Sequence, residues 1–210
     1  MIDVRTERAA LCDLFERLGP DAPTLCAGWT TADLAAHLVL RERRIDALPG
    51  IALAPFARYT AAVQARIRQR HPWPELIGLV RNGPPAWSPY RVPAIDALVN
   101  TLELFVHHED VRRAQDGWEP RELPAGFQDL LWRRLRGMAR LMFRRAPVGV
   151  VLRRTGGERI GGKKADPYVV VTGEPQELML FAFGRQAHAR VTCTGDEEAV
   201  DRLRTAPLGV

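Results

Sequence analysis

The chain has 210 residues and a mass of 23.5 kDa, a length typical of one domain or of one domain with a small appendage. Hydrophobic residues make up 46% and charged residues 26%, which excludes wholesale disorder, and no apolar run approaches the roughly 20 residues that cross a bilayer. The net charge of +5 permits binding to polyanions, but the arginines are scattered among acids and no nucleic-acid-binding motif is present. No apolar segment follows Met1, so we expect a cytoplasmic protein without nucleic-acid or membrane partners.

Three cysteines stand far apart in the sequence, at Cys12, Cys26 and Cys193. Their odd number and the absence of a Cys-x-x-Cys pair argue against a disulfide framework and against a cysteine-rich zinc site. Cys12 falls on an apolar helix face, where a core role is expected. Cys26 precedes Gly28 and Trp29 in a loop, and a reactive thiol there is the less favoured interpretation.

The first 146 residues have the pattern of helices separated by prolines. Apolar spacing, prolines and capping residues predict where the helices begin and end. The first predicted helix ends at Gly19-Pro20, and the second runs from a cap at Thr30 or Thr31 to Pro49-Gly50. Further helices are predicted over Phe56–Arg70, over the short stretch Glu75–Val80, and over about Ala94–Gln115 and Ala125–Arg144.

After Pro147 the pattern changes to short β-branched runs bounded by glycine, threonine and proline. Strands are predicted over Val148–Leu152, Tyr168–Val171 and Arg190–Thr194, and short helices over Glu174–Phe183 and Asp196–Thr205. We therefore expect an α+β, mainly α protein, with a helical bundle at residues 1–146 and a small α/β domain at residues 147–210.

The helix around residue 103 carries a polar stripe within an apolar arc. At 100° per residue, Glu103, His107 and Asp110 point in nearly the same direction, with Leu102 and Leu104 on the two flanks. Burial of these groups costs several kcal/mol unless a metal ion or a closed hydrogen-bond network compensates it. On this helix alone the hydrogen-bond network is the favoured interpretation.

A third group strengthens the metal interpretation. His37 lies between Leu34 and Leu38 on an inward helix face, and with Glu103 and His107 it completes two histidines and one carboxylate. Three protein ligands with an open position are typical of catalytic zinc, and the same set describes the facial triad of non-haem iron enzymes. His71, His108 and His188 are weaker candidates, since none shares this stripe.

Several motifs resemble one known family. Residues 29–38, WTTADLAAHL, are similar to the N-terminal signature of the mycothiol-dependent maleylpyruvate isomerases, a branch of the DinB-like metal-binding bundles. Residues 103–107, ELFVH, followed by Asp110 and Arg113-Ala114, resemble the second motif of that family, and segments at 169–173, 180–185 and 191–196 resemble its small C-terminal domain. His108-Glu109 departs from the family pattern of a glycine and an aromatic residue.

The resemblance implies a DinB-like four-helix bundle that binds a divalent metal through His37, Glu103 and His107. Zinc is the expected metal, with nickel and iron as alternatives. It also implies mycothiol, the small thiol of actinobacteria, as co-substrate. The metal would lower the pKa of the bound thiol, and the thiolate would attack a small electrophilic substrate in a transferase or isomerase reaction.

The remaining polar residues of the motifs have candidate roles around this centre. Arg41 and Arg44 follow His37 on nearly the same stripe, and Arg185 ends a short helix, so each is a candidate for binding an anionic substrate or the thiol. Asp33 and Asp110 are candidates to hydrogen-bond the metal-binding histidines. The alternative to an enzyme is a non-catalytic metal-binding or small-ligand carrier protein, in either case a monomer or a small homo-oligomer.

Overall fold

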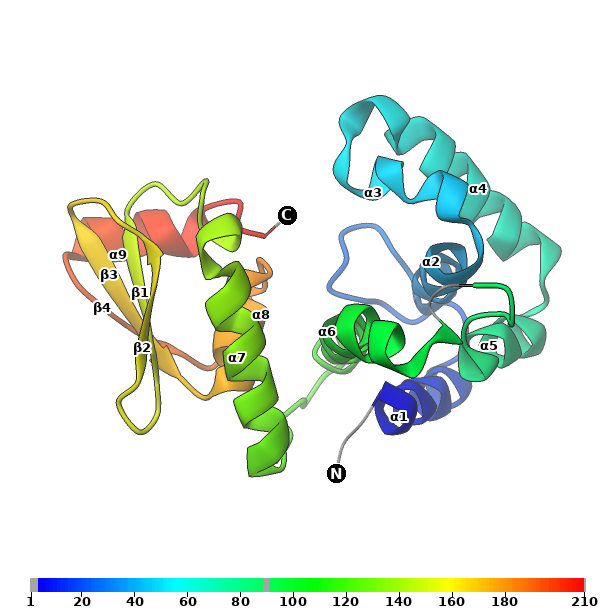
Figure 1. Ribbon diagram of the computed structural model, residues 1–210, viewed down its shortest axis with the longest axis horizontal. Coiled ribbons are helices and arrows are strands. Elements are labelled where there is room, and N and C mark those ends of the chain that lie inside the picture. The colour runs from blue at the N-terminus through cyan, green and yellow to red at the C-terminus, as the bar shows by residue number, and fades with distance from the viewer. Residues whose placement is uncertain (1–3, 89–90, 210) are drawn as a thin grey trace. The chain divides into compact units, whose positions relative to one another are not determined.

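The computed structural model describes residues 4–88 and 91–209, with the backbone alone described at Ala52 and over residues 93–99. Contacts divide the chain into two compact units, Ile2–Glu119 and Pro120–Val210 (Figure 1). Within the described residues, no helix is both long enough and apolar enough to span a membrane. Each unit has its own architecture.

Over its described residues, the first unit is built from helices and 3-10 turns, with one isolated β-bridge between Pro23 and Thr30. Its elements, in chain order, are α1 (Val4–Leu18), α2 (Thr31–Arg43), the 3-10 turn η1 (Ile45–Ala47), α3 (Pro49–Ala52), the 3-10 turn η2 (Ala54–Phe56), α4 (Ala57–Arg70), α5 (Trp73–Asn82) and α6 (Pro93–Arg112).

Four helices of this unit share one hydrophobic core. Side chains from α1, α2, α5 and α6 meet there, among them Phe15, Leu34, Ile77 and Leu104, all almost completely buried. A smaller cluster of Leu40, Ala47 and Val63 packs α4 on the far end of α2. The expected four-helix bundle is therefore present, with α3 and α4 added to it.

Buried polar contacts, one of them an ion pair, tie the bundle helices to one another. Arg8 of α1 lies 2.6 Å from Glu42 of α2, and Asn100 of α6 donates to the same carboxylate at 3.3 Å. His108 of α6 lies 2.9 Å from Glu7 of α1. Because a buried charge separated from its partner is strongly destabilising, these pairs favour one register of α6 against α1 and α2. That register places the polar stripe of α6.

Over its described residues, the second unit consists of three α-helices, one 3-10 turn and a small mixed sheet. Its elements are α7 (Ala125–Met142), β1 (Gly149–Arg154), β2 (Arg159–Lys163), β3 (Tyr168–Gly173), α8 (Pro175–Ala182), the 3-10 turn η4 (Gln186–His188), β4 (Thr192–Thr194) and α9 (Glu197–Thr205). The strand order is β2-β1-β3-β4.

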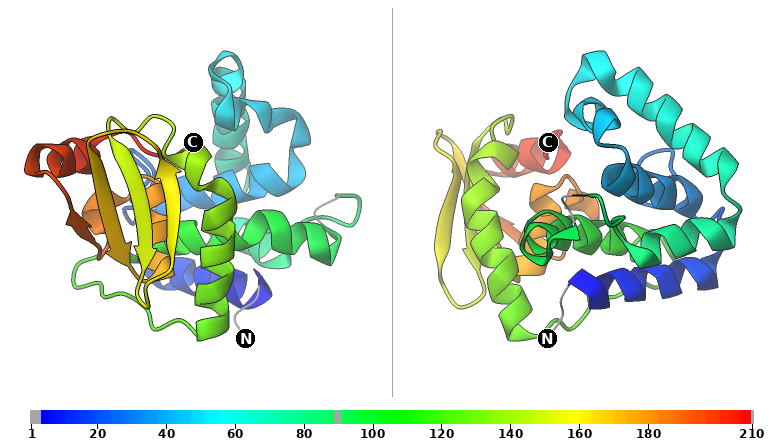
Figure 2. Two further views of the ribbon diagram at one scale, coloured as in Figure 1. Left: turned by 60° about the vertical axis from the view of Figure 1, so that its left-hand side comes forward. Right: turned by 45° about the vertical axis from the view of Figure 1, so that its right-hand side comes forward.

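The central strands β1 and β3 run parallel, with Val150 opposite Val169, and the edge strands β2 and β4 are antiparallel to their neighbours. The helices α7, α8 and α9 lie on one side of the sheet (Figure 2). This one-sided cover matches the alternation along β1 and β3, where Val150, Leu152, Val169 and Val171 are completely buried and the residues between them are not.

Most predicted elements are present, and the differences have local causes. The second helix ends at Arg43, because Arg44 leaves the helical conformation (φ −127°, ψ 72°), and Ile45, which lies within the predicted helix, is half exposed. The strand β2 was not predicted, since its sequence RIGGK has only one β-branched residue. It forms through antiparallel pairing, with Ile160 opposite Leu152.

The division of contacts also differs from the boundary expected after residue 146. Secondary structure changes from helices to strands there, but α7 packs against α8 and β2 and so belongs to the second unit. Phe143, which follows α7, stacks on Phe181 of α8 with ring centroids 6.4 Å apart. The amphipathic pattern of α7 predicts that one face of the helix is buried, but it does not indicate which elements cover that face.

Candidate metal centre

His37, Glu103 and His107 meet at one point of the bundle. Nε2 of His37 lies 3.3 Å from Oε1 of Glu103, and Nε2 of His107 lies 3.0 Å from the same oxygen. Each of the three side chains offers one ligand atom, and these atoms all lie within 4.8 Å of one another. The three residues named from the sequence are thus brought together.

Local structure explains why these side chains converge. Glu103 and His107 are four residues apart on α6 and therefore share a helix face. His37 lies in the middle of α2, a helix whose N-terminus is fixed by a capping box between Thr30 and Asp33. Trp29 packs against the imidazole of His37, with ring centroids 5.0 Å apart.

Strong electrostatic coupling links the three groups. Burial opposes the imidazolium form, yet the carboxylates of Glu103 and Asp110 raise the pKa of His107 well above its usual value. Burial lowers the pKa of His37 despite its contact with Glu103. Burial would raise the pKa of Glu103, but His107, His37 and Arg41 hold it well below its usual value. The ionised carboxylate is therefore surrounded by positive or hydrogen-bonding groups.

The donor set fits a divalent metal. Two imidazole nitrogens and one carboxylate oxygen are ordinary ligands of zinc and of several first-row metals, and three protein ligands leave a position open. Both imidazoles and the guanidinium of Arg41 contact one oxygen of Glu103, and a bound cation would take over the neutralisation of this carboxylate. His37, Glu103 and His107 would hold the ion.

Arg41 is the arginine that reaches this centre. Its Nη1 atom lies 3.1 Å from Oε1 of Glu103, and its side chain is largely buried. Arg44 is directed elsewhere, because its guanidinium donates to Asp46 and Tyr59 on an exposed surface. Arg185 lies in the second unit and donates to the carbonyl of Phe183, so its role in binding an anionic substrate or the thiol stays a prediction.

The two aspartates differ in their contacts. Asp110 lies beside the centre, with Oδ2 at 2.9 Å from Nδ1 of His107, as expected for a residue that orients a metal-binding imidazole. Asp33 instead accepts hydrogen bonds from the backbone and side chain of Thr30 and pairs with Arg68 at 2.6 Å. Its place in the first turn of α2 makes it a capping residue, which differs from the role expected beside a histidine.

His108 and Glu109, which depart from the family motif, both have structural partners. His108 pairs with Glu7, and Glu109 lies 2.6 Å from Nε of the completely buried Arg113. The guanidinium of Arg113 also stacks over Trp118 at 4.7 Å. These contacts anchor the second half of α6.

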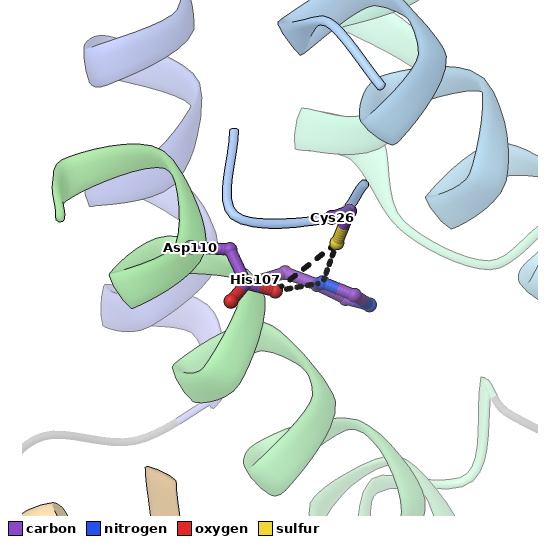
Figure 3. Close-up of side chains that lie close together, drawn as sticks. All are labelled: Cys26, His107 and Asp110. Carbon is purple, nitrogen blue, oxygen red and sulfur yellow. Dashed lines mark hydrogen bonds and ion pairs between the residues drawn. The ribbon is translucent and has the colours of Figure 1, made fainter. Parts of the chain in front are cut away.

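One residue at the centre was underrated from the sequence. Sγ of Cys26 lies 3.2 Å from Oδ2 of Asp110 and 3.8 Å from Nδ1 of His107 (Figure 3). The loop that carries Cys26 is held to α6, since the backbone N–H of Leu25 donates to the carbonyl of Asp110. A signal was present in the sequence, because Cys26 stands three residues before the Trp29 that opens the first motif.

Fold and site together define a helical bundle with a candidate site of two histidines and one carboxylate, followed by a small mixed-sheet unit. The family model of the mycothiol maleylpyruvate isomerase N-terminal domain matches residues 4–83. That range includes α1, α2 and α5 together with His37, and the match confirms the resemblance seen in the sequence.

Two solved structures are similar over most of the chain. The crystal structure of the mycothiol-dependent maleylpyruvate isomerase covers 91% of this chain and 90% of its own, with a TM-score of 0.57 and 18% identity. A histidine-to-alanine mutant of that isomerase gives the same coverage and TM-score at 17% identity. At these identities the likeness shows the fold. No curated protein matches the sequence.

Proposed function

We propose that this chain is a metal-dependent enzyme of the cytoplasm that uses mycothiol, or a thiol closely similar to it, to attack a small electrophilic substrate in an isomerase or transferase reaction. The single observation that carries the proposal is the convergence of His37, Glu103 and His107, whose ligand atoms lie within 4.8 Å of one another. The family match over residues 4–83 and the structural likeness to a mycothiol-dependent isomerase support the choice of thiol.

When bound, a divalent cation supplies Lewis acidity, which lowers the pKa of a thiol so that the nucleophilic thiolate exists at neutral pH. The side chains of the chain itself supply position and charge. Asp110 accepts a hydrogen bond from Nδ1 of His107 and thereby leaves Nε2 as the atom that faces Glu103 and His37. Trp29 covers one face of the His37 ring and limits its motion.

Arg41 is the residue that we propose for recognition of an anionic group on the substrate or on the thiol. Its guanidinium reaches the Glu103 carboxylate, so it lies within a side chain's length of the reacting atoms. A cation that neutralises Glu103 would leave the guanidinium available to a carboxylate, for which its planar fork is suited.

The experiment is elemental analysis of untagged protein, followed by a titration of the cobalt-substituted protein with mycothiol. In the protein as purified, before any metal is added, we expect about one divalent ion per chain, and in the cobalt-substituted protein a change in the spectrum when the thiol is added. As purified, His37→Ala and His107→Ala should lose most of this metal while the helical content is retained. His71→Ala is the matched control, because His71 pairs with Glu75 on the surface.

The outcomes separate the proposal from its alternatives. Metal without any response to the thiol would identify a metal-binding module that lacks this chemistry. Absence of metal even after reconstitution would show that Glu103 and His107 belong to a buried hydrogen-bond network, and stoichiometric metal in both histidine variants would overturn the proposed ligands.

A further inference from the structure

A second group of metal-binding side chains lies on the other edge of the His107 ring. Cys26, Asp110 and Nδ1 of His107 meet there, with the sulfur on the loop before α2 and the other two groups on one turn of α6 (Figure 3). The three separations are 2.9 Å between Asp110 and His107, 3.2 Å between Cys26 and Asp110, and 3.8 Å between Cys26 and His107. Neither His37 nor Glu103 takes part in this group.

We propose that Cys26, Asp110 and His107 form a second site, which binds a thiophilic divalent cation such as zinc, cadmium or cobalt. A thiolate, an imidazole and a carboxylate are all ordinary zinc ligands. Bond lengths of about 2.0–2.3 Å in a tetrahedral site place neighbouring ligand atoms about 3.3–3.6 Å apart. The three observed separations lie within about 0.5 Å of that range, so only small side-chain movements are needed to admit an ion.

The backbone around the site is fixed before any ion binds. His107 and Asp110 are three residues apart on α6, and Leu25 N–H donates to the Asp110 carbonyl at 3.0 Å. Thr24 Oγ1 accepts from the Cys26 backbone and donates to the Trp29 carbonyl at 2.9 Å, which closes the loop. Gly28 lies at φ +76°, a conformation that favours glycine and allows the turn after Cys26. Because these hydrogen bonds already order the loop, binding of an ion costs less conformational entropy.

Burial and access suit a cation. His107 and Asp110 are buried, and Cys26 is partly exposed, so an ion reaches the group from the side of the loop. Binding replaces the S–H proton of Cys26, which passes to solvent as the metal–sulfur bond forms, and the Nδ1 proton of His107, which moves to Nε2 when the first site is empty and to solvent when it is filled. The buried carboxylate of Asp110 compensates part of the charge of the ion.

The two sites use opposite nitrogens of the same ring. Nε2 of His107 faces Glu103, and Nδ1 faces Cys26 and Asp110. One ring can therefore bridge two cations as an imidazolate, in which case the Nδ1 proton is also released to solvent. Each site can also fill alone, with a neutral His107.

Cobalt distinguishes the second site, because a thiolate ligand produces a charge-transfer absorption that nitrogen and oxygen ligands lack. In the full chain carrying His37→Ala and Glu103→Gln, which removes the first site, we expect about one cobalt ion per chain and a thiolate charge-transfer band. Cys26→Ser in that background should lose both. Cys193→Ser is the matched control and should retain both, because Cys193 lies in β4 of the second unit.

The wild-type protein and the Cys26→Ser variant complete the test. We expect about two cobalt ions per chain at saturation in the wild type and about one in Cys26→Ser, without the charge-transfer band. A wild type that shows no such band at saturation overturns the second site, as does a band that persists in Cys26→Ser. If the wild type binds only one cobalt ion at saturation and still shows the charge-transfer band, the first site is empty. That result would count against the proposed function and leave this inference intact.

Discussion

Nη1 of Arg41 lies 3.1 Å from Oε1 of Glu103, the same oxygen that both imidazoles contact. A guanidinium and a metal ion would therefore compete for this carboxylate. We predict that Arg41→Gln binds zinc more tightly than the wild type, by about fivefold if the ion pair contributes ~1 kcal/mol. Competition with a chelator measures the affinity. Arg44→Gln is the matched control and should leave it unchanged, and weaker binding in Arg41→Gln would contradict the competition.

Asp110 holds the Nδ1 edge of His107 at 2.9 Å. Asp110→Asn replaces the charged acceptor with an amide that also presents a donor to the ring, so the orientation of His107 is less well defined. We expect the affinity for a divalent metal at the first site to fall about 10-fold to 100-fold. A metal titration measures the affinity of this variant, and the same titration of His37→Ala shows how much affinity is lost when a ligand itself is removed. Circular dichroism checks that the helices are intact. Unchanged affinity would show that Asp110 acts only in folding.

Asp33 connects helix capping to pH. Burial would raise the pKa of its carboxyl, but hydrogen bonds from Thr30 and the charge of Arg68 lower it below the ordinary 3.8. The depressed pKa means that the ionised carboxylate stabilises the folded chain above pH 3.8, and that this contribution is lost as the pH falls through the folded pKa.

We therefore predict that Asp33→Asn lowers the free energy of unfolding by about 1 kcal/mol at neutral pH. The difference from wild type should shrink as the pH falls below 3.8, which urea unfolding at several pH values measures. Asp13→Asn is the control, because Asp13 is an exposed partner of Arg81, and surface ion pairs contribute little. A penalty independent of pH would contradict the role of the charge.

Cys12 should be unreactive in the folded protein. It is completely buried in the bundle core, and burial raises the pKa of its thiol to about 12. At pH 8 the thiolate fraction is then roughly one in ten thousand. We expect iodoacetamide to leave Cys12 unmodified until urea unfolds the chain, as peptide mass analysis would show. Fast modification in the native state would mean that α1 opens locally.

Much of this architecture follows from local sequence. The Thr30–Asp33 capping box starts α2 where the sequence indicates, and Gly19 with Pro20 ends α1 there. The spacing of Glu103 and His107 puts both on one face of α6 whatever that helix packs against. His37 could be named as their partner because its flanking residues show an inward face, and the family motif supported the choice. Helical periodicity and capping act over a few residues, so these features are visible without a tertiary structure.

Other features depend on contacts between distant segments. β2 forms because β1 pairs with it, and α7 joins the second unit because of its contacts with α8 and β2. The approach of Cys26 to Asp110 spans 84 residues of sequence and depends on how the loop folds over α6. Likewise, the choice of Arg41 over Arg44 follows from the end of α2 at Arg43, beyond which Asp46 and Tyr59 capture Arg44. The sequence determined which side chains face inward, and only packing between elements decided which of them meet.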